Sequence, residues 1–188
     1  IVRDPGGHIL SFGPEQGEQG EAESIMLFEI ERISNADEIE SLRRNIVEAV
    51  DDVCASVRDW PRMKAKMLAI ADELPTLNMP FDKDTLIEAQ NFLKWIADDH
   101  FTFLGFREYR VLDDGGDEVL KPIAESGLGI MRDGSHGMAV RPLKNLAATG
   151  LDKSGSVGAL ILTKTNARSR VHRPGHMDYL SVLGFNEN

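Results

Sequence analysis

The sequence predicts an α+β fold, in which a largely helical middle separates two stretches of antiparallel strands. Three observations predict it. Apolar residues recur at three- and four-residue steps between residues 34 and 99, which is typical of amphipathic helices. On both sides of this region apolar and polar residues alternate, as in half-buried strands. Clusters of Gly, Pro and Asp separate the runs, and such clusters mark turns.

Composition narrows the class of protein and its partners. The chain has 188 residues, of which 41% are hydrophobic and 28% charged, as in a soluble globular protein. It lacks the run of about eighteen apolar residues that a membrane span needs. A single cysteine and the absence of a signal-peptide pattern indicate a cytoplasmic location. The net charge of −10 excludes general nucleic-acid binding, because phosphate neutralisation needs a wide basic surface.

Residues 1–33 are expected to form antiparallel strands. The turn residues Asp4-Pro5-Gly6-Gly7 join two short strands, because Pro presets φ and Gly supplies positive φ. The alternation over Ser24–Ile33 predicts a third strand. No helix precedes these strands to cover their apolar face, so we expect that the chain begins inside a domain.

Residues 34–80 are expected to form a helical hairpin followed by a linker. Asn35 and Glu38 have the spacing of a capping box, which marks the start of a helix. We expect Asp59-Trp60-Pro61 to end this helix, with Pro61 opening the next one. The first helix has a long apolar stripe, formed by Ile39, Leu42, Ile46, Val50, Val53 and Val57.

Residues 81–188 are expected to form an antiparallel sheet with a flanking helix. The helix starts at Asp82 or Asp84 and ends near Asp99. The aromatic-rich stretch Phe101–Leu112 then alternates as a strand, and its aromatic residues predict a buried, central position. The turn Asp113-Asp-Gly-Gly-Asp117 leads to a strand at Glu118–Ala124. Further short strands are expected at Leu128–Arg132, Met138–Pro142, Ala159–Lys164, Ser169–Arg173 and Tyr179–Leu183.

The nucleotide-binding motifs are incomplete. Gly127-Leu-Gly129 begins like a dinucleotide fingerprint, but Arg132 occupies the third glycine position and no helix follows. The sequence also lacks the Gly-Lys-Ser/Thr loop of nucleoside triphosphate sites. We therefore expect no cofactor-binding residue in this chain.

Two histidine-containing clusters also have a structural explanation. Asp98, Asp99 and His100 are adjacent, and adjacent residues on a helix point apart, so we expect them to make local hydrogen bonds. His172 and His176 are four residues apart, but Pro174-Gly175 prevents the helix that zinc binding at this spacing would need. We expect neither a catalytic residue nor a metal ligand.

The basic segment 163–174 is the best candidate for binding. From Lys153 to Met177 the chain contains five basic residues and no acidic one. In one extended strand, alternate residues of the segment share a face; a turn at Asn166 would instead make Lys164 a cross-strand neighbour of Arg168 or Arg170. Either arrangement could bind a carboxylate or phosphate. The alternative is a charged edge strand or an interdomain contact. The candidate residues are Lys164, Arg168, Arg170, His172 and Arg173.

Several motifs resemble the N-terminal region of the large bacterial NAD-specific glutamate dehydrogenases. They are Ile1-Val-Arg-Asp-Pro-Gly-Gly7, Glu23-Ser24, Val57-Arg-Asp-Trp60, Asn91-Phe-Leu-Lys-Trp-Ile-Ala-Asp-Asp-His-Phe-Thr-Phe-Leu-Gly-Phe-Arg-Glu-Tyr109, Gly127-Leu-Gly-Ile130, Leu162-Thr-Lys-Thr-Asn-Ala-Arg-Ser-Arg-Val-His-Arg-Pro174 and Asp178-Tyr179. Their order and spacing cover nearly the whole chain.

The resemblance implies a fold, a role and partners. Residues 1–33 would be the C-terminal strands of an ACT-like domain, and residues 81–188 a PAS-like domain, expected to be incomplete at its C-terminal end. The role would be non-catalytic regulation or assembly, with small-molecule sensing as the alternative. NAD would bind in the catalytic domain of the full-length enzyme, and the fragment itself would need no cofactor. The partners would be downstream domains, a second copy in a homo-oligomer and an amino-acid or carboxylate effector.

Overall fold

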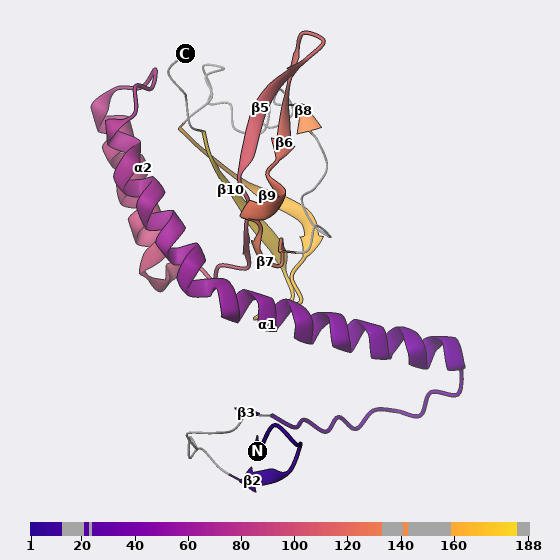
Figure 1. The fold of residues 1–188 in the computed structure, drawn as a ribbon. Coiled ribbons are helices and arrows are strands. Elements are labelled where there is room, and N and C mark those ends of the chain that lie inside the picture. Colours follow the sequence, from indigo (N-terminus) through magenta and orange to yellow (C-terminus); the bar gives the residue numbers. More distant parts are fainter. Residues whose placement is uncertain (13–20, 23, 133–140, 143–158, 184–188) are drawn as a thin grey trace. The chain divides into compact units, whose positions relative to one another are not determined.

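The computed structural model describes residues 1–12, 21–22, 24–132, 141–142 and 159–183 (Figure 1). Helices and antiparallel strands are both present, so the predicted α+β class is confirmed. Backbone contacts divide the chain into two compact units, Ile1–Ser41 and Leu42–Asn188. Over the described residues, no helix has both the length and the apolar character needed to cross a membrane. The finer division into 1–33, 34–80 and 81–188, and the ACT-like and PAS-like assignments, stay predictions.

The first unit contains a small antiparallel sheet in the order β2-β1-β3. Its strands are β1 (Val2–Arg3), β2 (Ile9–Ser11) and β3 (Glu21–Ala22). The predicted turn is confirmed: the Gly7 amide donates to the Asp4 carbonyl at 2.9 Å. The predicted strand at Ser24–Ile33 is wrong, because no described strand pairs with this segment and its large apolar side chains are exposed. Alternation alone does not make a strand without a neighbouring backbone to pair with.

One long helix, α1 (Ala36–Glu73), replaces the predicted helical hairpin. Its start is confirmed, since the Asn35 side-chain oxygen accepts a hydrogen bond from the Asp37 amide at 2.9 Å. Pro61 lies inside the helix and does not end it. Proline removes one backbone hydrogen bond and bends a helix, and α1 is visibly bent in Figure 1. Buried contacts of Asp59 before the proline and Met63 after it hold the helix on both sides.

The second helix, α2 (Lys83–Trp95), begins where predicted. The Asp82 carboxylate caps it, accepting hydrogen bonds from the Thr85 amide at 2.9 Å and the Thr85 hydroxyl at 2.8 Å. A 3-10 turn, η1 (Leu74–Thr76), ends α1, and α2 returns alongside the C-terminal part of α1 (Figure 1). The core of the second unit lies here, formed by the buried residues Ala71, Leu74, Met79, Leu86, Ala89, Leu93 and Ala159.

A π-helical turn, η2 (Ile96–His100), follows α2. Asp99 has a φ of 60°, in the left-handed region, and this conformation ends the helix. The His100 ring donates from Nδ1 to the Trp95 carbonyl at 2.9 Å, and the Asp99 carboxylate binds the Lys64 ammonium at 3.0 Å. The cluster makes local contacts as predicted, although Asp99 binds a lysine of α1 and not a backbone N–H.

The predicted continuous strand at Phe101–Leu112 is wrong. The chain forms two separate strands, β4 (Gly105–Phe106) and β5 (Tyr109–Asp114). Between them Arg107 turns into the interior and the Glu108 amide donates to the Ser126 hydroxyl at 2.8 Å, so both residues leave the ladder. The preceding aromatic residues Phe101 and Phe103 are therefore only half-buried.

The hairpin after this strand is confirmed. β5 pairs with β6 (Asp117–Pro122), and Gly115 and Gly116 form the two-residue turn with φ values of 69° and 97°. These values fit a type I′ turn. The short strand β8 (Arg141–Pro142) also pairs with β6, whereas residues 138–140 of the predicted strand lie outside the described residues. A 3-10 turn, η3 (Ala124–Ser126), leads to β7 (Leu128–Gly129), which pairs with β4.

The last two strands are β9 (Leu160–Arg168) and β10 (His176–Val182), which pair antiparallel. They contain most of the strands predicted at Ala159–Lys164 and Tyr179–Leu183. The strand predicted at Ser169–Arg173 is wrong, because these residues form the turn between β9 and β10. The Ser169 hydroxyl accepts from the Val171 amide at 3.0 Å, and His172 has a φ of 67°.

Candidate functional site

The predicted basic segment lies on β9 and on the turn that follows it. The segment stays extended as far as Arg168, so Asn166 does not form a turn. In the register of β9 with β10, Lys164 lies opposite Asp178, and their charged groups are 2.6 Å apart. Lys164 is therefore balanced by a carboxylate of its own sheet, which is the favourable cross-strand arrangement.

Arg170 makes a contact between distant parts of the second unit. Its guanidinium forms an ion pair with the carboxylate of Glu48 on α1. Both side chains remain about half exposed, so this pair contributes little to stability. It does direct one of the candidate anion-binding residues toward the chain's own helix.

The remaining candidates do not converge with these two. Arg168, His172 and Arg173 are exposed, and among the described residues no ion pair involves the side chain of Arg168 or Arg173. A hollow of about 180 Å³ lies between the turn and α1, lined partly by Arg168, Arg170 and Asp52. This is smaller than the roughly 300 Å³ at which small-molecule sites begin. Effector binding by Lys164, Arg168, Arg170, His172 and Arg173 stays a prediction.

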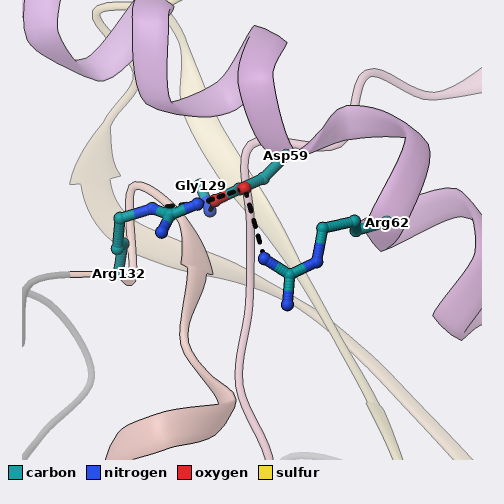
Figure 2. Close-up of polar contacts among 4 residues, drawn as sticks. All are labelled: Asp59, Arg62, Gly129 and Arg132. Atoms are coloured by element: carbon teal, nitrogen blue, oxygen red, sulfur yellow. Dashed lines mark hydrogen bonds and ion pairs between the residues drawn. The ribbon is translucent and has the colours of Figure 1, made fainter.

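The most highly organised polar group in the described part of the chain is Asp59 of α1. Only 1% of it is exposed. Its carboxylate accepts a hydrogen bond from the Gly129 amide at 2.8 Å and another from Arg132 Nε at 3.1 Å (Figure 2). The terminal nitrogen of Arg132 binds the second carboxylate oxygen, and Arg62 lies 3.8 Å from it. The helix is thereby joined to the loop that follows β7.

These contacts keep Asp59 ionised despite its burial. Burial alone would raise the pKa of the carboxyl group, because it penalises the charged form. The hydrogen bonds from Gly129 and Arg132 and the positive charges of Arg132 and Arg62 outweigh that effect, so the pKa of Asp59 lies below its ordinary value of 3.8. Asp59 is thus a permanently charged connection at neutral pH and does not act as a proton donor or acceptor.

The Gly127-Leu-Gly129 loop has a structural explanation. Gly129 has a φ of 58°, and a Cβ atom there would lie 2.1 Å from the Leu104 carbonyl oxygen. A Cβ on Gly127 would lie 2.4 Å from the Met131 carbonyl oxygen. Both positions require glycine because backbone approaches backbone, and the amide that could have faced a phosphate binds Asp59 instead. Within the described residues, no group of three or more His, Cys, Asp or Glu side chains could hold a metal ion.

Sequence reasoning missed Asp59, which it treated as part of a helix break. Its main partners lie at Gly129 and Arg132, far along the chain, so no local spacing indicated the contact. The one available signal was an acidic residue in the middle of a helical stretch, followed at a distance by a glycine pair and an arginine.

Comparison with known proteins gives two relatives with the same name. The NAD-specific glutamate dehydrogenase of Halomonas elongata is 32% identical over 171 residues, and that of Pseudomonas aeruginosa is 33% identical over 192 residues. The chain resembles the NAD-specific glutamate dehydrogenases. The matches cover 90% and 97% of this chain but 11% of each relative, so the chain corresponds to a small segment of those proteins. The resemblance inferred from the motifs is confirmed. No family model and no solved structure matches the chain.

Proposed function

We propose that the chain is the N-terminal regulatory and assembly part of a cytoplasmic NAD-dependent glutamate dehydrogenase. The whole enzyme would convert L-glutamate, NAD and water into 2-oxoglutarate, ammonia and NADH. NAD and glutamate would bind downstream of this segment. The proposal is carried by similarity that covers 90–97% of this chain and 11% of two NAD-specific glutamate dehydrogenases.

A role in assembly is supported by where the charges of the chain are used. Lys164 and Arg170 pair with carboxylates of the same chain, and the buried charge of Asp59 is enclosed by Arg132 and Gly129. These contacts join strands and turns to α1 and do not surround a substrate-sized space. The expected partners are the downstream domains of the same polypeptide and further copies of it.

Two assays test the proposal. The 188-residue chain, mixed with L-glutamate and NAD, should form no NADH. The Pseudomonas aeruginosa enzyme lacking the matching segment should still form NADH at its active sites, but its particle mass or its response to effectors should change. NADH formation by the isolated chain would overturn the proposal. So would a deletion that abolishes glutamate oxidation while particle mass and effector response stay unchanged.

A further inference from the structure

The apolar stripe of α1 lies on the face of the helix that points away from the rest of the second unit. Glu48, Ser56 and Asp59 make the contacts to β9, β4 and β7: the Ser56 hydroxyl, for example, donates to the Leu104 carbonyl at 3.1 Å. At about 100° per residue, the apolar residues lie roughly 130° around the helix from this contact face. A helix of a globular domain normally buries its apolar face, and α1 buries its polar one.

The α1 stripe consists of residues spaced three and four apart that are 39–68% exposed: Ile46, Val50, Val53, Val57 and Trp60. This spacing is the repeat by which two helices pack side by side in a coiled coil. The residues that flank the stripe are uncharged, among them Val47, Ala49, Cys54 and Ser56. Charges at such flanking positions usually select a different partner helix or exclude self-pairing, and α1 has none there.

We propose that this surface binds the same surface of a second copy of the chain, with the two α1 helices antiparallel. The stripe is self-complementary in one register, centred between Asp51 and Asp52. In that register Ile46 faces Val57 of the second copy, and Val50 faces Val53. The same register sets Arg43, at one end of the stripe, against the indole of Trp60 at the other, a favourable pairing of a cation with an aromatic ring.

Parallel pairing is disfavoured by the same residues. It would set Arg43 against Arg43 and Trp60 against Trp60, so that like charges oppose each other. Antiparallel pairing also opposes the two helix dipoles and creates the two-fold symmetric contact that most homodimers use. The inference names the partner surface behind the assembly role and rests on the function proposed above.

The first test is the mass of the 188-residue chain by analytical ultracentrifugation across a concentration series. The wild-type chain should be a dimer, and Ile46→Glu should raise the dissociation constant at least about tenfold, because it places a charge in the apolar contact. Ile87→Glu is the matched control: Ile87 of α2 is 47% exposed, against 42% for Ile46, and the same change there should leave the dimer intact. A wild-type monomer, or a dimer indifferent to Ile46→Glu, would overturn the inference.

Crosslinking tests the orientation without relying on a disruptive variant. In a Cys54→Ser background, chains with Ile46→Cys and chains with Val57→Cys should crosslink to each other when mixed and oxidised. Neither should crosslink alone, because in the antiparallel register each cysteine lies about 16 Å along the axis from its own copy. Self-crosslinking of either variant would indicate a parallel pair and contradict the proposal.

These results are separable from the assembly role itself. If the 188-residue chain is monomeric but the Pseudomonas aeruginosa enzyme loses mass when the matching segment is deleted, the stripe is not the contact and the assembly role stands. If neither result is seen, the assembly role fails as well.

Discussion

At the scale of single residues, Asp59 is the main connection between α1 and the β-structure. Removing it would leave Arg132 and the Gly129 amide without their buried acceptor. Breaking such a buried pair from one side costs several kcal/mol, because the remaining charge and donor stay desolvated. The carboxylate therefore contributes through the groups that it satisfies more than through its own attraction.

Asp59→Ala is expected to lower the free energy of unfolding by about 3 kcal/mol or more, measured by urea denaturation. Asp72→Ala is the control. Its carboxylate also forms an ion pair, with Lys94 at 2.9 Å, but that pair is exposed and should cost less than about 1 kcal/mol. Equal effects of the two substitutions would show that the Asp59 contacts do not stabilise the fold.

Stability should also depend on pH through Asp59. Its pKa is below 3.8 in the folded chain and near the ordinary value in the unfolded chain, so the unfolded state binds more protons between these values and stability rises with pH. The contribution is complete above the unfolded pKa and is lost as pH falls through the folded one. Unfolding measured from about pH 6 to 2.5 should fall less steeply in Asp59→Ala than in Asp72→Ala. Parallel curves would contradict this assignment.

At the scale of elements, the glycine turn after β7 depends on close backbone approach. Gly129→Ala should lower the free energy of unfolding by more than about 2 kcal/mol, because a left-handed φ and a clash with the Leu104 carbonyl act together. Gly175→Ala is the control: a Cβ atom there meets no atom within 4 Å. Thermal unfolding should place this control within a degree or two of wild type, as for a surface substitution. A stable Gly129→Ala protein would mean that the turn can move.

The elements also show which features local sequence could predict. Asp82 before α2 and the Gly115-Gly116 turn were predictable because each acts within a few residues. Pro61 was misleading because proline disfavours a helix interior without forbidding it, and contacts of Asp59 and Met63 outweigh that preference. The strand at Phe101–Leu112 was overestimated because alternation does not reveal that Arg107 turns inward.

The candidate site was predicted less well than the fold. The sequence identified the basic residues, but their partners Asp178 and Glu48 are set by strand register and tertiary packing. The apolar stripe of α1 was predicted accurately as a pattern. Its exposure was not predictable, because periodicity shows that a helix has an apolar face and does not show what covers it.

At the scale of the whole molecule, the net charge of −10 opposes the proposed self-association. Two copies repel each other, and dissolved salt screens that repulsion. The dimer should therefore bind more tightly at about 150 mM salt than at about 20 mM, as measured by ultracentrifugation. Weaker association at the higher salt would show that attraction between charges, and not the apolar stripe, drives pairing.

The contact between Asp59 and Gly129 has one more consequence. A glycine-rich turn with a free amide can bind an anion brought from solution, and here the anion is supplied by the protein itself. The turn is thus a receptor whose ligand is covalently tethered through the helix. A search for phosphate-binding loops that reads only the glycines would count it as vacant, although its ligand is already built into the chain.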